Sequence, residues 1–335
     1  MKLAIVILNW NGRSFLEKFL PSLIARTPSW ASLVVADNAS TDDSISFLRE
    51  KYPDVQLILN DKNYGFAQGY NLALAQIDAE YYCLLNSDIE VAENWIEPVI
   101  ELMDGDAQIA AVQPKIRSFH HRENFEYAGA AGGFIDKYGY PFCRGRVFET
   151  IETDNGQYDS AIDIFWATGA ALFVRSDVYR ELGGLDEDFF AHMEEIDLCW
   201  RIKNHGYRIL VEPRSSVFHV GGGTLPKNNS FKTFLNFRNN HFLLIKNLPR
   251  HRLFPTFCAR LILDNVAAFM FLLQGHRKDF CAVYKAQRAV IKDFKKFKKK
   301  RNGQKFDAYK DIEKRPILIS YHLLRKHHFN GEKFF

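Results

Sequence analysis

YYCLLNSDIEV, residues 81–91, contains the pattern on which the fold of the first half of this chain rests. Its apolar run, 81–85, has the length of one buried strand and stops at Asn86 and Ser87, which are followed by a single acid, Asp88. Aspartate is a common turn residue, so a strand that ends in this way has an ordinary structural explanation. The alternative is that the Asp88 carboxylate binds a ligand at the tip of the strand.

Similar apolar runs lie on both sides of this stretch, and segments with helical spacing of apolar residues separate them. The expected strands are LAIVIL (3–8), SLVVAD (32–37), VQLIL (55–59) and IAAVQ (109–113). The expected helices span about 14–23, with Ser14 as a candidate N-cap, and then 42–51, 66–77 and 93–103. Strands that alternate with helices indicate βαβ units and a mostly parallel sheet.

The polar residues at the strand ends are expected to lie together. Right-handed crossovers place the strand-to-helix loops of a parallel sheet on one edge, and ligands bind outside the carboxyl ends of such strands. Asn9, Asp37, Asn63 and Asp88 follow four different strands. The pattern therefore predicts one cleft to which these four side chains contribute.

The second half of the chain is less regular. Residues 115–163 are rich in glycine, aromatic and charged residues without clear periodicity, which predicts an insertion or a long loop. Regular structure is expected to return as strands at 169–174, 207–211 and 215–220, as helices at 176–182 and 194–206, and as a largely helical segment from about 230.

Composition indicates a folded chain in a reducing compartment. Of its 335 residues, 47% are hydrophobic and 14% aromatic, which excludes a disordered chain. The cysteines are scattered, odd in number and without a CxxC pair, so they support neither a disulfide framework nor a zinc site; they are Cys83, Cys143, Cys199, Cys258 and Cys281. The N-terminal apolar run is too short for a signal peptide and is expected to be the first strand.

Charge divides the chain into two parts. Residues 1–245 carry a balance of −11, whereas residues 246–335 hold 22 Lys and Arg against 7 Asp and Glu, a balance of +15. The net charge of +4 hides this asymmetry. An acidic body with a basic tail suggests two different tasks.

Asp88 and His219 are the candidate metal ligands. Mg²⁺ or Mn²⁺ prefers oxygen ligands, and Mg²⁺ is commonly held by one or two carboxylates together with substrate phosphates. Asn86 and Ser87 could add oxygen ligands or bind the phosphates. His219 ends a strand before Gly221-Gly222-Gly223 and could bind the metal or a phosphate, although a single histidine at a strand end is more often structural.

Asp37 is a candidate nucleotide contact. In dinucleotide-binding folds an acid at this strand end commonly binds a ribose or base edge. The competing role is helix capping, which Ser40, Thr41 and Asp42 can perform, so that Asp37 stays free for a ligand. The loop after the first strand has no GxGxxG, which argues against a nicotinamide or flavin enzyme.

A second acidic cluster, EEIDL (194–198), is expected on a helix. Glu194 and Asp197 would share one face of it, while Glu195 points about 100° away. One carboxylate aimed into a cleft can act as a general base on a hydroxyl. The alternative is an ordinary solvated face, or an ion pair between Asp197 and Arg201.

The order of these motifs resembles that of family 2 glycosyltransferases with the GT-A fold, in particular the bacterial rhamnosyltransferase-like branch. The matching segments are VILNWNG (6–12), VADNASTDDS (35–44), NYGFAQGYN (63–71), LLNSDIEV (84–91), WATGAALFVRS (166–176), GGLDEDFF (183–190), MEEIDLCWRIKNHGY (193–207) and HVGGGT (219–224). The resemblance implies an α/β, GT-A-type Rossmann-like fold over residues 1–245. Its mostly parallel sheet would have flanking helices, and residues 246–335 would add a C-terminal helical extension.

The resemblance also implies the reaction, an inverting transfer of a sugar from a UDP- or dTDP-linked donor to a hydroxyl of a glycan or lipid-linked acceptor. It places Asn9 and Asp37 near the nucleoside, Asn63 and Gly65 along the donor, Asp88 on the metal, Glu195 or Asp197 as the base, and Trp166 and Gly169 on the acceptor side. Apart from the resemblance, Asn86 is expected beside the diphosphate, His219 as a further ligand of Mg²⁺ or Mn²⁺, and Glu194 on the acceptor side.

Two positions depart from the family pattern. The first aspartate of the usual metal motif is replaced by Asn86, which removes one carboxylate from the expected metal site. The base in the family is usually the aspartate of a Glu-Asp pair, and here that position holds Glu195. Glutamate reaches one methylene further and can serve, so Glu195 is the favoured base and Asp197 its rival.

The basic tail is expected to form amphipathic helices. Arg260 and Asp264 interrupt the apolar segment 254–273, so it predicts a one-sided apolar helix around Phe257, Leu261, Phe269 and Leu272 rather than a membrane span. Residues 292–301 contain seven cations and one acid, which suits anionic lipid. We expect peripheral attachment to the cytoplasmic face of the membrane. The alternative is a tail that packs on the body with solvated lysines.

Two other functions compete with the transferase. A sugar-phosphate nucleotidylyltransferase would need a glycine- and arginine-rich loop with a lysine after the first strand, and NWNGRSF (9–15) matches this poorly. A non-catalytic, membrane-associated sugar-binding protein would not need Asp88, Glu195 and His219. No segment resembles a nucleic-acid-binding module.

Overall fold

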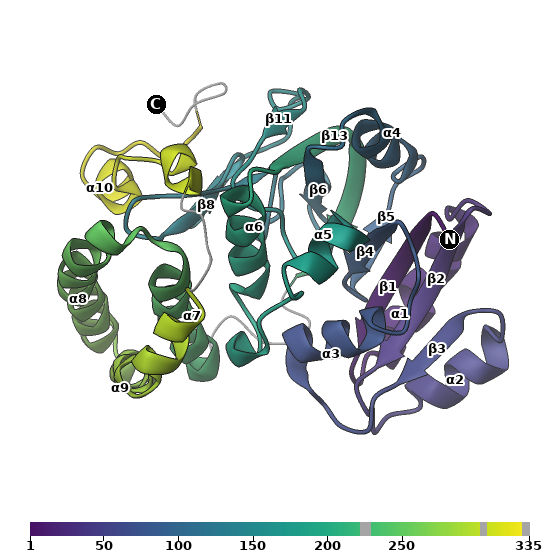
Figure 1. The fold of residues 1–335 in the computed structure, drawn as a ribbon, viewed down its shortest axis with the longest axis horizontal. Helices are drawn as coiled ribbons and strands as arrows, with labels where there is room; N and C mark the ends of the chain where they lie inside the picture. The colour runs from purple at the N-terminus through teal and green to yellow at the C-terminus, as the bar shows by residue number, and fades with distance from the viewer. Residues whose placement is uncertain (222–228, 302–306, 330–335) are drawn as a thin grey trace.

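The computed structural model describes residues 1–221, 229–301 and 307–329 and forms a layered α/β fold (Figure 1). Within this part of the chain the central sheet has nine strands, in the order β11-β13-β6-β12-β4-β1-β2-β3, with β5 paired to β13. They are β1 (Leu3–Asn9), β2 (Ala31–Asp37), β3 (Gln56–Leu59), β4 (Tyr81–Leu85), β5 (Ile89–Val91), β6 (Ile109–Ser118), β11 (Ile162–Asp163), β12 (Ala171–Arg175) and β13 (Arg208–His219).

The direction of the strands brings the predicted loops to one edge of the sheet. β1 is parallel to β2 and to β4, and the register pairs Asn9 with Asp37 and Ile7 with Leu85. β12 runs antiparallel between β4 and β6, so its first residue, Ala171, pairs with Leu85 at the same edge. β6 and β13 are parallel to each other, and their last residues also point to this edge.

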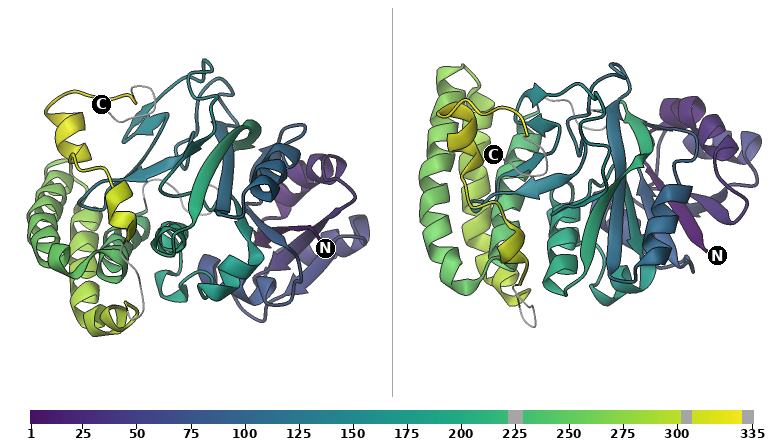
Figure 2. Two further views of the ribbon diagram at one scale, coloured as in Figure 1. Left: turned by 45° about the horizontal axis from the view of Figure 1, so that its top comes forward. Right: turned by 90° about the horizontal axis from the view of Figure 1, so that it is seen from above.

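Helices cover both faces of the sheet (Figure 2). Leu3, Ile5 and Ile7 of β1 belong to a buried cluster shared with α1, α2 and α4. The alternate residues Ala4 and Val6 belong to a second cluster shared with α3, α5 and α6. This alternation is the period-2 pattern of a strand buried on both sides. The helices are α1 (Arg13–Ala25), α2 (Ser44–Lys51), α3 (Gly65–Leu74), α4 (Glu97–Gly105), α5 (Ser176–Glu181) and α6 (Glu194–Asn204).

The irregular stretch 115–163 contains a second, small antiparallel sheet, in the order β10-β9-β8-β7. Its strands are β7 (Gly133–Ile135), β8 (Pro141–Cys143), β9 (Arg146–Val147) and β10 (Thr150–Ile151). Each has only two or three residues, too few for the alternation on which sequence-based strand prediction depends. The stretch is therefore more regular than its sequence indicates, and its two ends belong to β6 and β11 of the central sheet.

The C-terminal helices pack on the body. They are α7 (Ser230–Asn247), α8 (Arg250–Leu273), α9 (Arg277–Lys299), the short 3₁₀ helix η2 (Asp307–Asp311) and α10 (Ile317–His322). Trp200 of α6, Phe242 of α7, Phe297 of α9 and Ile317 of α10 belong to one buried cluster. The rings of Phe242 and Phe297 stack with centroids 3.6 Å apart. The expected helical extension is present, and it shares its core with the sheet domain.

Several local predictions need correction. Helix α1 begins at Arg13 with Gly12 as its N-cap and no side-chain capping bond, so Ser14 is not the cap. Helix α4 begins at Glu97 rather than near 93, because Pro98 in its first turn has no N–H and suits a helix start. The strands expected at 207–211 and 215–220 are one strand, β13, with a shift of pairing between Glu212 and Ser216.

Candidate active site

Asn9 and Asp37 meet at the ends of β1 and β2. Asn9 Nδ2 donates a hydrogen bond to Asp37 Oδ2 over 2.8 Å, and both side chains are buried. Ser40 donates twice to the same carboxylate, from its N–H and its hydroxyl, each over 2.7 Å. The expectation that Ser40 leaves Asp37 free is therefore wrong, because Asp37 fixes the turn that contains Ser40. Asn9 Oδ1 is buried and has no hydrogen-bond partner among the described residues.

Gly12 lies between Asn9 and the end of β4. A Cβ added to Gly12 would be 2.4 Å from Asn9 Oδ1 and 3.6 Å from Ser87 Oγ. The first distance is shorter than any real contact, so this approach requires glycine. The NWNG loop after β1 and the NSD turn after β4 are consequently in contact, as the strand order predicts.

Asn63 and Gly65 form the start of α3. Asn63 is exposed, and its Oδ1 accepts from the Gly65 N–H over 2.9 Å. Gly65 has a φ of +73°, and a Cβ there would be 2.7 Å from the Phe190 ring, so glycine is needed on both grounds. Asn38, which sequence reasoning missed, is buried and donates from Nδ2 to the Gly65 carbonyl over 2.9 Å. Asn38 thereby joins the end of β2 to the start of α3.

Asp88 and His219 lie together, as predicted. His219 Nε2 is 3.2 Å from Asp88 Oδ1, and both side chains are nearly buried. Asn86 Nδ2 is 3.5 Å from the same ring nitrogen. The other ring nitrogen, Nδ1, is 3.3 Å from Glu126 Oε2, a contact that lacks hydrogen-bond geometry. His219 is therefore held between two carboxylates, of which sequence reasoning missed Glu126.

Burial and charge shift the pKa values of the trio Asp88, Glu126 and His219 in opposite directions. Burial lowers the pKa of His219, but the close contacts with the negatively charged Asp88 and Glu126 outweigh it and raise the pKa to about 10. Burial raises the pKa of Asp88, and His219 outweighs it, so the Asp88 pKa lies below its ordinary value. The same balance lowers the pKa of Glu126. The arrangement on its own is an imidazolium between two carboxylates.

A divalent cation at this position would need ligands from outside the protein, because among the described residues no group of three His, Cys, Asp or Glu side chains is placed to hold a metal ion. Asp88 and His219 could supply two ligands, an oxygen and Nε2, with the others coming from a bound diphosphate. Glu126 would then face Nδ1, and a carboxylate behind a metal-binding histidine is a common support for such a ligand. Gly222, Gly223 and Thr224 of the HVGGGT motif lie outside the described residues.

Glu195 lies in the first turn of α6. Its Oε2 has no hydrogen-bond partner among the described residues, although the side chain is partly accessible. Burial raises the pKa of Glu195 to about 7. The neighbouring Glu194 is more deeply buried, and burial together with the Glu195 charge raises its pKa well above the ordinary value. Glu195 is the acid of this cluster whose pKa and partial exposure suit a general base.

Asp197 has a different environment. It is fully buried, and its carboxylate is bound by Arg201 over 2.9 Å, Lys246 over 2.7 Å and the Asn247 side chain over 2.8 Å. Burial acts to raise its pKa, but Lys246 and Arg201 outweigh it, so the pKa of Asp197 is lowered. The alternative prediction of an Asp197–Arg201 ion pair is confirmed. A carboxylate with all these partners and no exposed surface is poorly placed to take a proton from a substrate.

The loop before α6 is strained and tightly held. Phe190, His192 and Met193 have φ angles of 67°, 69° and 74°, in the left-handed region that non-glycine residues avoid. Strain of this kind persists only where the surrounding structure imposes it. The side-chain amide of Asn239, in α7, donates to the carbonyls of Phe189, Ala191 and His192 over 3.0, 2.8 and 2.7 Å. Helix α7 thus holds the backbone directly before Glu195.

Gly169 links Glu195 to the end of β4. A Cβ on Gly169 would lie 3.6 Å from Glu195 Cβ, so the two residues are neighbours. The next carbonyl, that of Ala170, accepts from the Asn86 N–H over 2.9 Å. Trp166 is buried, and its Nε1 donates to the Phe134 carbonyl over 2.8 Å, which connects the segment before Gly169 to the small sheet.

Comparison with known proteins adds a family and a fold. The family model described as "Glycosyl transferase family 2" matches residues 4–173. An N-acetylglucosaminyl-diphospho-decaprenol L-rhamnosyltransferase of Mycobacterium tuberculosis is 26% identical over 235 residues, which cover 65% of this chain and 75% of the relative.

Two solved structures have a similar fold. A mannosyltransferase from Pyrobaculum calidifontis, in complex with GDP-Man and Mn²⁺, is 15% identical with a TM-score of 0.53, covering 90% of this chain and 84% of that one. Staphylococcus aureus TarS 1–349, in complex with UDP-GlcNAc, is 13% identical with a TM-score of 0.56, covering 92% of each chain. At this identity the likeness concerns the fold, and the predicted GT-A-type architecture is confirmed.

Proposed function

The chain belongs to glycosyl transferase family 2, and from this premise we propose an inverting transfer of a sugar from a nucleotide diphosphate to an acceptor hydroxyl. The acceptor is a glycan or a lipid-linked saccharide of the cell envelope. The L-rhamnosyltransferase among its relatives supports a lipid-linked acceptor and a deoxyhexose or hexose as the transferred sugar. We propose UDP or dTDP as the nucleotide of the donor.

The observation that carries the proposal is the position of Glu195. Its unpaired carboxylate oxygen lies in the first turn of α6, beside Gly169. Through Ala170 and Asn86 the same segment adjoins the Asp88–His219 pair at the end of β4. The proposed base and the residues proposed to hold the cation of the diphosphate are thus neighbours at one sheet edge, as a displacement at a sugar carbon requires.

The proposed reaction is a single displacement. Glu195 takes the proton of the acceptor hydroxyl as that oxygen forms a bond to the anomeric carbon of the donor. The bond from this carbon to the diphosphate oxygen breaks, and its electron pair leaves with the nucleoside diphosphate. A divalent cation, when bound, neutralises charge on the diphosphate; Asp88 and His219 would hold it, and the Mn²⁺ of the mannosyltransferase complex supports this role.

The remaining residues are proposed to bind and orient. Asn9 is proposed to contact the nucleoside through its unpaired Oδ1, with Asp37 as its support. Asn63 and Gly65 would line the donor on the side of α3. Trp166, Gly169 and Glu194 would shape the acceptor side. Because the raised pKa of Glu194 favours its neutral form, the proton acceptor on this side would be Glu195.

Transfer measured with single-residue variants tests the proposal. Glu195→Gln should lower kcat at least about 10²-fold, within the range of a lost general base, while nucleotide-sugar binding, followed by thermal stabilisation, should persist. Glu50→Gln, an exposed and distant change of the same type, is the control. Unchanged transfer by Glu195→Gln, or release of pyrophosphate from a nucleoside triphosphate and a sugar phosphate, would contradict it.

A further inference from the structure

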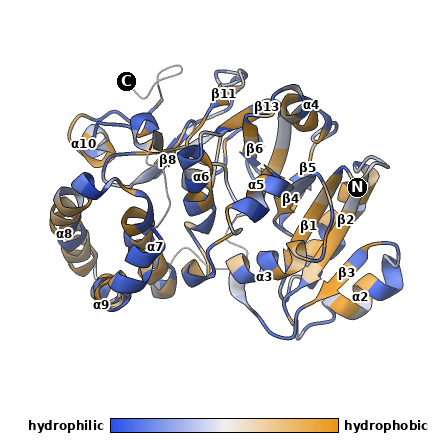
Figure 3. Ribbon diagram, viewed as in Figure 1, coloured by the Kyte–Doolittle hydropathy of each residue, from blue (hydrophilic) through white to orange (hydrophobic). Residues whose placement is uncertain are grey.

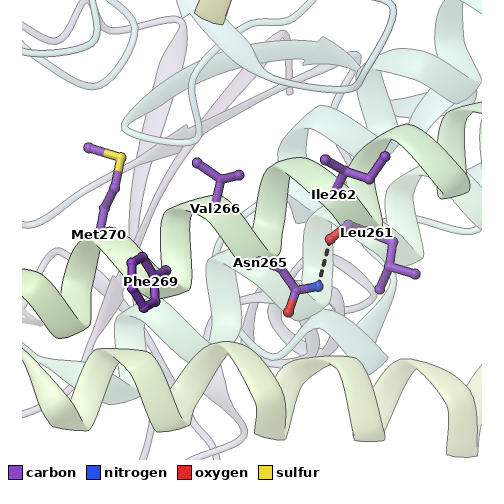
Figure 4. A pocket seen from close by; sticks show the side chains of 6 residues that line it. All are labelled: Leu261, Ile262, Asn265, Val266, Phe269 and Met270. Carbon is purple, nitrogen blue, oxygen red and sulfur yellow. Dashed lines mark hydrogen bonds between the residues drawn. The ribbon is translucent and has the colours of Figure 1, made fainter.

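Helix α8 has an apolar face that no other part of the described chain covers. Its exposed residues are large and apolar, between 49% and 78% accessible, and extend over five turns: Phe254, Leu261, Ile262, Val266, Phe269, Met270 and Leu273. Figure 4 shows Leu261, Ile262, Val266, Phe269 and Met270 along one helix, where they line a shallow pocket with Asn265. In Figure 3 this helix lies at the edge of the molecule, away from the sheet. Exposed apolar surface of this extent indicates a binding site.

The opposite face of α8 is anchored in the body. Arg260 and Asp264 are buried and paired over 3.0 Å, and His241 of α7 is 2.7 Å from the same Asp264 carboxylate. Tyr140, which directly precedes β8, also donates to Asp264 over 3.4 Å. These contacts join α8 to α7 and to the 115–163 insertion.

This anchoring decides how α8 can meet a membrane. By length and composition α8 could span one, with a mean hydropathy of 1.7 over 18 residues, of which only 22% are buried. To do so it would have to break its bonds to α7 and carry Arg260 and Asp264 into hydrocarbon, which is costly. A helix held by one face can instead lie in the plane of the interface with its other face in the lipid.

Cations lie along the neighbouring helix. The Tyr284 hydroxyl of α9 donates to Asn265 of α8 over 2.9 Å, so the exposed side of α9 adjoins the apolar face. That side of α9 carries exposed Lys285, Arg288, Lys292 and Lys295. A row of cations beside a stripe of apolar side chains is the arrangement that binds anionic lipid headgroups.

We propose that the apolar face of α8 and the cations of α9 form a docking surface for an anionic lipid bilayer, on which α8 lies flat. A second copy of the chain is a poorer occupant. A two-fold contact through this face would bring the cation rows of both copies to one interface, where they repel. This proposal concerns a surface outside the active site and does not depend on the base or the metal ligands.

Sedimentation with vesicles tests the apolar part. The full chain should bind vesicles containing 30% phosphatidylglycerol and bind pure phosphatidylcholine far more weakly. The double variant Ile262→Ser, Phe269→Ser should bind roughly tenfold or more weakly, since two apolar side chains no longer enter the lipid. Leu59→Ser, Ile151→Ser, at exposed positions on the sheets, should bind as the parent does. Equal binding by both double variants would overturn the proposal.

Two further measurements complete the test: vesicle binding by variants with altered charge, and the oligomeric state of the lipid-free chain. Lys292→Gln, Lys295→Gln should weaken binding to the anionic vesicles and reduce its salt dependence, whereas Lys51→Gln, Lys310→Gln should not. Light scattering of the lipid-free chain distinguishes the other occupant. A dimer that the Ile262→Ser, Phe269→Ser variant dissociates, together with no vesicle binding by the parent, would assign the face to a second copy and overturn the proposal.

Discussion

The Asn239 side-chain amide donates to the carbonyl of His192 over 2.7 Å, so a residue of α7 fixes the backbone three positions before Glu195. Arg238, its neighbour, donates to the Phe189 carbonyl over 2.9 Å. The loop before α6 contains three strained φ angles, and these hydrogen bonds hold it in that conformation. The geometry of the proposed base therefore depends on Asn239, a residue that follows it by more than forty positions.

Replacing Asn239 tests this restraint. Asn239→Ala removes a buried amide to which three carbonyls are hydrogen-bonded, so the free energy of unfolding should fall by about 2 kcal/mol. We also expect kcat to fall about tenfold or more while KM for the donor changes little, because the base is displaced and the nucleotide site is not. Asn155→Ala, at an exposed position, is the control. A stability loss with unchanged kcat would leave Asn239 a purely structural residue.

The pKa of Glu195 predicts a pH profile. A general base must be unprotonated, so kcat/KM should fall as pH drops below about 7, the raised pKa of Glu195. Because the folded state binds this proton more tightly than the unfolded chain does, the carboxylate destabilises the fold above pH 7. Glu195→Gln should therefore raise the free energy of unfolding at pH 8 by about 1–2 kcal/mol and have little effect at pH 4. An acidic limb near pH 4.5 in the parent would show that the pKa of the base is not raised by burial at Glu195.

Glu126 is expected to control metal affinity through His219. Glu126→Gln removes the carboxylate that faces Nδ1, 3.3 Å away, and so weakens the orientation of the ring. Affinity for Mn²⁺ in the presence of a nucleoside diphosphate, measured by calorimetry, should fall about 10–100-fold. Glu123→Gln, an exposed neighbour, should bind Mn²⁺ as the parent does. Unchanged Mn²⁺ affinity in Glu126→Gln would show that His219 does not act in a metal site supported by Glu126.

Asp197→Asn distinguishes the two candidate bases. It should lower the free energy of unfolding by about 3–5 kcal/mol, because Lys246 and Arg201 lose their buried counter-charge. The kcat of the remaining folded protein, measured at low temperature, should stay within about tenfold of the parent. A loss as large as that in Glu195→Gln, without a loss of stability, would make Asp197 the base.

Sequence patterns sufficed for the core of the fold. The apolar runs that became β1, β2 and β4 are buried on both faces, and such runs are visible without knowledge of their neighbours. The polar residues that follow them could be assigned to one edge from topology alone. The strands of the 115–163 insertion and β5 (Ile89–Val91) could not be predicted, because they are too short to carry a period and are stabilised by distant partners.

The residues that support the site could not be predicted from the sequence, for a related reason. Glu126 and Asn239 carry no local signal, since each acts on a residue more than forty positions away.

The basic tail illustrates the same limit of prediction from sequence. Its lysines predicted a charged surface, yet Lys296 and Lys300 bind Asp188 and Asp186 of the loop before α6, over 2.5 Å each. Only the remaining cations of α9 are left to face a membrane.

These ion pairs also affect the order in which parts of the chain can fold during synthesis. During synthesis, Asp186 and Asp197 leave the ribosome well before Lys246, and Lys300 follows Asp186 by 114 residues. Until α9 and Lys300 have emerged, Asp188 lacks both of its lysines and Asp186 lacks one of its two. The loop before Glu195 therefore gains its full set of ion pairs only when the last long helix has been made.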